Sequence, residues 1–114
     1  MLDKRLFSRF KIHCNCSLAL EDKFQVFDAA LEDISLGGLR ISTFTPLNVG
    51  QRLYFTISIK PPIKGVARVV WIQKNTDRYT AGLEIVEMKE KFKHNLQELI
   101  NELTLKTLSS AYFR

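Results

Sequence analysis

Strict alternation of apolar and polar residues constrains the fold of this chain more than any other feature. Between residues 12 and 20 every second position is apolar: Ile12, Cys14, Cys16, Leu18 and Leu20. The cleanest repeat of this pattern comes later, at Leu53, Phe55, Ile57 and Ile59. A period of two places these side chains on one face of a β-strand, whereas an amphipathic helix needs a period near 3.6. The sequence therefore predicts a mainly β fold whose strands bury one face.

Further strand signals are separated by turn residues. We expect strands at 24–31, 39–43, 66–73 and 79–86, in addition to the two alternating segments. The apolar parity changes between Val26 and Phe27, which indicates a bulge. Six or seven short strands with turns between them favour a small antiparallel barrel or sandwich.

The hydrophobic period becomes helical near the C-terminal end of the sequence. Apolar residues recur at helical spacing among Lys, Glu, Asn and Gln: Phe92, Leu96, Leu99, Ile100 and Leu103. This pattern predicts a helix over 89–108 and a frayed tail over 109–114. The helix is expected to pack on its own barrel, over one opening or flank, in preference to another subunit.

Length and cysteine usage set the class of protein. The 114 residues suit a single domain. Residues 1–20 lack the apolar core of a signal peptide, and no run approaches the ~20 apolar residues of a membrane span. Cys14 and Cys16 share one strand face, which is poor geometry for a disulfide, and His13 lies on the other face. We therefore expect reduced thiols, no zinc site and a cytoplasmic protein.

The positive charge of the chain is concentrated at its start. The formal net charge is +5, which favours an anionic partner. Lys4, Arg5, Arg9 and Lys11 crowd the first eleven residues. Arg5 and Arg9 in an extended segment can hold an anion from two sides, because guanidinium groups bind phosphate oxygens or the O6 and N7 edge of guanine. A solvated basic terminus is the alternative for this motif on its own.

A second candidate motif spans residues 33–38. Asp33 and Ser35 are two apart, so on a strand they project to the same face. An ionised Asp accepts two hydrogen bonds at once, which matches the N1–H and N2–H₂ donors of guanine, and Ser adds a hydroxyl. Gly37 and Gly38 permit positive φ or close backbone approach, and Gly38 leaves space for a ligand. The alternative is an Asx or Ser turn before a tight bend.

Catalytic motifs are missing from the sequence. It contains no Gly-x-Ser-x-Gly, no His-Glu-x-x-His and no phosphate loop, and His13 and His94 lie in different predicted elements. We expect a binding protein without cofactor or metal, and not an enzyme.

In their order and separation, the two motifs resemble the PilZ family, in which Arg-x-x-x-Arg precedes the first barrel strand and Asp/Asn-x-Ser-x-x-Gly follows about two strands later. Further segments that resemble the family are Gly50–Leu53, Ala67–Trp71 and Tyr79–Ile85. The resemblance implies a six-stranded antiparallel β-barrel with a C-terminal α-helix, in a bacterial receptor for cyclic di-GMP. The single domain then divides into a basic segment 1–10, a barrel 11–88 and a helix 89–108.

The resemblance also implies roles for individual residues. Arg5 and Arg9 form a clamp, and Asp33, Ser35 and Gly38, with Gly37, form the facing barrel surface. Lys4 stands where many members carry another Arg, which leaves the number of bound nucleotides open. Trp71 either stacks on a base or is a barrel residue with one face covered. Ligand binding would order the N-terminus against the Asp33 face and signal to a downstream protein of motility, biofilm formation or secretion, from a monomer or weak dimer.

Two rival functions remain. The chain could be a PilZ-like interaction module that binds no nucleotide. A nucleic-acid binder ranks third, because Tyr54, Trp71 and Tyr79 are not interleaved with Lys and Arg as a stacking platform requires. We therefore expect no nucleic-acid partner.

Overall fold

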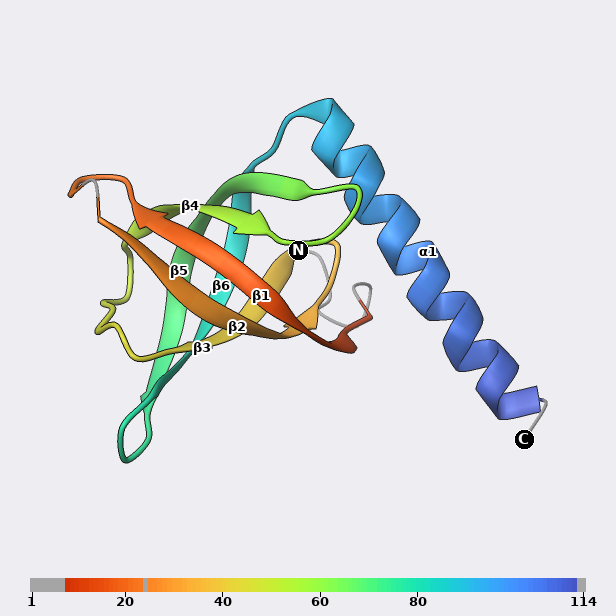
Figure 1. The fold of residues 1–114 in the computed structure, drawn as a ribbon, viewed down its shortest axis with the longest axis horizontal. Helices are drawn as coiled ribbons and strands as arrows, with labels where there is room; N and C mark the ends of the chain where they lie inside the picture. The colour runs from red at the N-terminus through yellow and green to blue at the C-terminus, as the bar shows by residue number, and fades with distance from the viewer. Residues whose placement is uncertain (1–7, 24, 113–114) are drawn as a thin grey trace, which may run out of the picture.

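Six antiparallel strands close into a barrel in the order β1-β2-β3-β6-β5-β4, and one helix follows them (Figure 1). The structure is a computed structural model that describes residues 8–23 and 25–112. The elements are β1 Phe10–Leu20, β2 Val26–Ile34, β3 Gly38–Thr43, β4 Arg52–Ile57, β5 Ile63–Lys74, β6 Tyr79–Glu87 and α1 Glu90–Tyr112. The predicted six-stranded barrel with a C-terminal helix is confirmed.

The alternating apolar residues fill the interior of the barrel. Leu18, Leu31, Ile41 and Phe55 are at most 1% exposed. They come from four different strands, and on each strand every second side chain points into the core. Barrel closure leaves no free sheet edge and gives the molecule a continuous outer surface that crosses all six strands.

The predicted bulge between Val26 and Phe27 is wrong. These two residues pair in unbroken register with Ala19 and Leu18 of β1. Val26 is 71% exposed, so this apolar side chain simply faces solvent. The irregularity of β2 lies further along the strand, between Leu31 and Asp33, where the register with β3 shifts.

Helix α1 is longer than the sequence pattern indicated. It continues to Tyr112, so the predicted fraying is wrong for residues 109–112, and residues 113–114 lie outside the described range. Leu96 and Ile100 are buried in the core cluster, and the helix packs mainly against β5, as expected. Its distal half extends beyond the barrel (Figure 1). Across the part of the chain that the structure describes, no helix is long and apolar enough to cross a membrane.

Candidate ligand site on the outer surface of the barrel

Asp33 lies at the centre of a cluster of charges on the barrel surface. Arg9 donates to Asp33 Oδ1 from Nε at 3.0 Å and from Nη2 at 2.5 Å. Arg40 Nε lies 3.1 Å from Oδ2 on the other side of the carboxylate. The Asp33 side chain is 10% exposed, whereas those of Arg9 and Arg40 are 51% and 40% exposed. Two guanidinium groups therefore fix the orientation of one nearly buried carboxylate.

An extra residue in β2 accounts for the outward orientation of Asp33. Leu31 pairs with Ile41, and Asp33 pairs with the next residue of β3, Arg40. Glu32 is therefore unpaired with β3, which is the definition of a bulge. Without this bulge Asp33 would share the inward parity of Leu31, and its carboxylate would point into the apolar core.

Cross-strand pairing extends the site into a row across five strands. Lys11 pairs with Asp33, Asp33 with Arg40, Arg40 with Gly82, and Gly82 with Trp71. Paired residues share a face of the sheet, so the row runs over the outer surface from β1 to β5. The row thus has a charged half, Lys11, Asp33 and Arg40, and an aromatic half, Trp71, with Gly82 between them.

The indole of Trp71 has one covered side and one accessible side. A Cβ atom at Gly82 would overlap the indole ring at Nε1, Cε2 and Cδ1, so the indole lies across the Gly82 backbone. The residue is nevertheless 40% exposed. One face of the indole is covered by β6, and the remaining surface is free to stack on a flat ligand.

The Ser35–Gly38 turn uses its polar groups internally. Ser35 is 3% exposed, and its Oγ accepts hydrogen bonds from the backbone N–H of Gly37 at 3.3 Å and of Gly38 at 3.1 Å. A Cβ at Gly38 would lie 2.6 Å from the carbonyl oxygen of Leu83. Gly38 is therefore required by the close approach of β3 to β6, and among the described glycines only Gly50 has positive φ, at 93°. The Ser-turn alternative accounts for both residues within the protein.

The structure brings together only part of the predicted site. Arg9, Asp33 and the Ser35–Gly38 turn are adjacent, and Trp71 lies on the same outer row. Lys4 and Arg5 fall outside the described residues, so half of the predicted clamp has no described position. Arg40 is a site residue that the sequence analysis missed. Its signal was present, because a charged residue between Leu39 and Ile41 of a buried strand must face outward.

The described residues can be compared with the ligand sets that bind metal ions. No group of three or more His, Cys, Asp or Glu side chains among them is close enough to hold a metal ion. His13 lies on β1 and His94 on α1.

Comparison with known proteins identifies the family. The family model described as PilZ domain matches residues 3–102. No curated protein sequence matches the chain. Among solved structures, the chain is similar to the PilZ domain with c-di-GMP of YcgR from Escherichia coli, with 17% identity and a TM-score of 0.74 over 98% of this chain and 100% of that one.

Two longer proteins share the fold. The inhibitor of motility MotI/DgrA from Bacillus subtilis is 17% identical, with a TM-score of 0.77 over 92% of this chain and 53% of that one. The MrkH–c-di-GMP complex from K. pneumonia is 14% identical, with a TM-score of 0.75 over 96% of this chain and 56% of that one. The chain thus spans little more than half the length of these two. At such identities the likeness concerns the fold, whereas the family model spans most of the sequence, and the chain belongs to the PilZ domain family.

Proposed function

We propose that the protein is a cytoplasmic receptor for cyclic di-GMP and not an enzyme. The observation that carries the proposal is the contact between Arg9 and Asp33, which unites the two sequence motifs on the surface of a PilZ barrel. The solved structures of the YcgR PilZ domain with c-di-GMP and of the MrkH–c-di-GMP complex, which share this fold, support the same ligand.

The charges of the site suit a nucleotide with phosphates and guanine bases. Asp33 accepts from the N1–H and N2–H₂ of a guanine, while Arg5 and Arg9 bind phosphate oxygens or the guanine O6 and N7 edge. Arg9 is half exposed, so its guanidinium can leave Asp33 Oδ1 and turn to the ligand without moving the barrel. Each charge-assisted hydrogen bond of this kind contributes about 1.5–3 kcal/mol.

Arg40 supplies a donor that lacks an acceptor. Its Nε is buried, and within the described part of the chain it has no hydrogen-bond partner, because Asp33 Oδ2 is near but poorly aligned. The Arg40 side chain as a whole is 40% exposed, so its terminal guanidinium nitrogens can donate to a ligand oxygen beside Asp33, and we add Arg40 to the ligand-binding residues.

The other proposed site residues lie around the Arg9–Asp33 pair in the sequence motifs or on the same surface row. Trp71 stacks on a base at the far end of the row, and Gly37 and Gly38 form the turn that carries the Asp33 face. Lys4 takes the place of a third arginine and governs how many nucleotides bind. Ligand binding orders the N-terminus against the Asp33 face, and a downstream protein binds the resulting surface.

Calorimetric titration tests this function directly. The parent should bind cyclic di-GMP and bind neither GTP nor a single-stranded oligonucleotide with comparable affinity. Arg9→Ala and Asp33→Ala should each weaken binding by at least about 10- to 100-fold, which corresponds to the loss of one charge-assisted bond. Arg52→Ala is the matched control, because Arg52 is likewise a partly exposed arginine that pairs with carboxylates, Glu21 and Glu87, elsewhere on the barrel. A folded parent that binds no cyclic di-GMP would instead support the nucleotide-free interaction module.

A further inference from the structure

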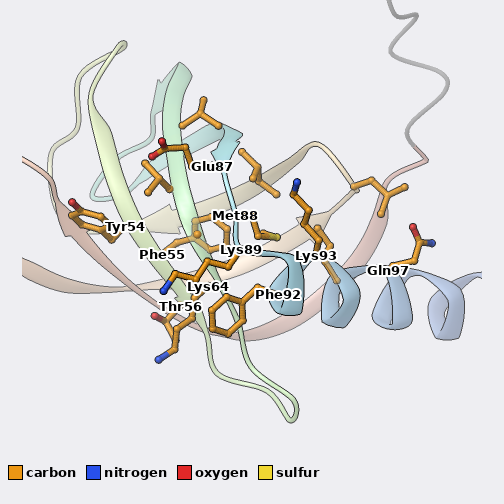
Figure 2. A pocket seen from close by; sticks show the side chains of 16 residues that line it. Tyr54, Phe55, Thr56, Lys64, Glu87, Met88, Lys89, Phe92, Lys93 and Gln97 are labelled. Carbon is orange, nitrogen blue, oxygen red and sulfur yellow. The ribbon is translucent and has the colours of Figure 1, made fainter.

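A large groove separates α1 from the barrel on the side of β4 and β5. Its volume is about 1060 Å³, and side chains of the barrel and of the first turns of the helix line it from two sides (Figure 2). Its lining includes Tyr54 of β4, Val66 of β5, and Met88 and Phe92 around the start of α1. Tyr54 is 52% exposed, so an apolar surface remains accessible between the two elements.

The rim of this groove carries an excess of positive charge. Lys64, Lys89 and Lys93 line it, against a single carboxylate, Glu87. Glu87 already pairs with Arg52 Nη2 at 3.2 Å. Among the described residues, neither Lys64 nor Lys89 has an ion-pair partner within 4.0 Å. An occupant that complements the groove therefore combines apolar side chains with acidic ones.

The shape of the groove favours a peptide segment over a small molecule. The volume is at or above the upper end of about 300–1000 Å³ that is usual for small-ligand pockets. A groove between a helix and a sheet surface, with apolar walls and charged rims, is the setting in which an amphipathic helix binds through one face.

The groove also touches the candidate nucleotide site. Leu36 lines it and belongs to the same turn as Ser35 and Gly37. Leu36 is 38% exposed, and the carbonyl of Gly37 accepts a hydrogen bond from the N–H of Ile85, another lining residue, at 2.9 Å. One side of this turn thus adjoins Asp33, and the other side forms part of the groove wall.

We propose that the groove between α1 and the barrel docks an acidic, amphipathic segment of a partner protein, and that it is the surface through which the nucleotide site acts. The docking rests on the groove alone, whereas the coupling to nucleotide rests on the proposed function. A ligand that binds Asp33 at one side of the turn of residues 33–38 shifts Leu36 at the other side, and thereby changes the fit of the docked segment.

The docking is tested with two fluorescent synthetic peptides and the full chain. One is helical with Leu and Phe on one face and Glu on the other, and its match carries Lys in place of every Glu. Fluorescence anisotropy should show the acidic peptide binding at least about 10-fold more tightly than the basic one, a difference of about 1.4 kcal/mol. Lys64→Glu with Lys89→Glu should remove this preference, while Lys23→Glu with Lys106→Glu, which changes the net charge equally outside the groove, should preserve it.

A second variant separates the apolar contacts from the charges. Tyr54→Ala should weaken the acidic peptide several-fold with an unchanged circular dichroism spectrum, because Tyr54 is half exposed and lies outside the core. Equal binding of the two peptides, or equal effects of the two double variants, would overturn the docking. Self-association of the parent in sedimentation velocity that is lost with Lys64→Glu and Lys89→Glu would also overturn it, because a second copy would then fill the groove.

The coupling has its own readout. Saturating cyclic di-GMP should change the affinity for the acidic peptide, and by thermodynamic linkage the peptide should change the affinity for cyclic di-GMP by the same factor. Leu36→Ala should reduce this factor. If the parent binds both ligands with no mutual effect, the coupling is wrong and the docking stands. If it binds no cyclic di-GMP, the proposed function fails, and the peptide comparison still decides the docking.

Discussion

Trp71 lies across the backbone of Gly82, its cross-strand partner on β6. The contact is possible because Gly82 has no side chain, and it leaves the indole 40% exposed on the outer surface. Gly82 also pairs with Arg40, so the residue that holds the indole adjoins the residue that contacts Asp33. The aromatic and charged halves of the site are therefore joined through one glycine.

Gly82→Ala should displace the indole. The added methyl group would overlap the ring, so the variant should lose about 1–3 kcal/mol of unfolding free energy from overpacking. Trp71 is the sole tryptophan of the sequence, so its emission reports the displacement directly. Urea unfolding of Gly82→Ala, Trp71→Ala and the double variant forms a cycle. The double variant should recover most of the loss caused by Gly82→Ala, and strict additivity would show that the two residues do not interact.

Arg40→Ala should weaken cyclic di-GMP binding about 10-fold or more, because it removes the exposed guanidinium nitrogens that donate to a ligand beside Asp33. The unfolding free energy should change by less than about 1 kcal/mol, because the guanidinium is partly exposed and its pairing with Asp33 is poorly aligned. Calorimetry measures the first effect and urea unfolding the second. Unchanged affinity, together with the expected loss for Arg9→Ala, would remove Arg40 from the site.

The sequence predicted the barrel and the Asp33 face but not the register that joins them. Alternation identifies which strands have a buried face, and the family resemblance supplies the strand number. The bulge at Glu32 has a signal that was not used: Leu31 and Ile34 are three residues apart and both fully buried, which an unbroken period of two does not allow. Arg40 could not be assigned to Asp33 until this extra residue was placed. The expected bulge after Val26 arose from treating an exposed apolar residue as a buried one.

In the turn that follows β2, residues that match the ligand-binding motif also have structural roles. Ser35 and Gly38 match a ligand-binding signature. In the structure, however, the Ser35 hydroxyl accepts hydrogen bonds from the turn itself, and the space beside Gly38 is filled by the Leu83 carbonyl. Ser35→Ala should lower the unfolding free energy by about 1–3 kcal/mol, because two N–H groups lose their acceptor. Gly38→Ala should cost at least as much, because its methyl group would lie 2.6 Å from the Leu83 carbonyl.

Measured affinity for cyclic di-GMP distinguishes a structural role of Ser35 from direct contact with the ligand. With correction for the folded fraction, Ser35→Ala should retain cyclic di-GMP affinity better than Asp33→Ala does. The measurement is calorimetry beside urea unfolding on the same preparations. A fully stable Ser35→Ala variant that has lost binding would show that the hydroxyl contacts the ligand and that the turn forms without it.

Cys16 should make stability fall at alkaline pH. Burial in the core raises the pKa of this thiol to about 12, from 9.0 for an unperturbed thiol. Above pH 9 the unfolded chain therefore binds fewer protons than the folded one, and the unfolding free energy decreases with rising pH until about pH 12. The comparison is between the parent and Cys16→Ala across the same pH series, which isolates the contribution of this thiol. The parent should show the steeper decline, and native thiol labelling at pH 8 should modify Cys14, which is half-buried, before Cys16. Equal slopes for the two proteins would show that Cys16 ionises as readily in the folded state as in the unfolded state.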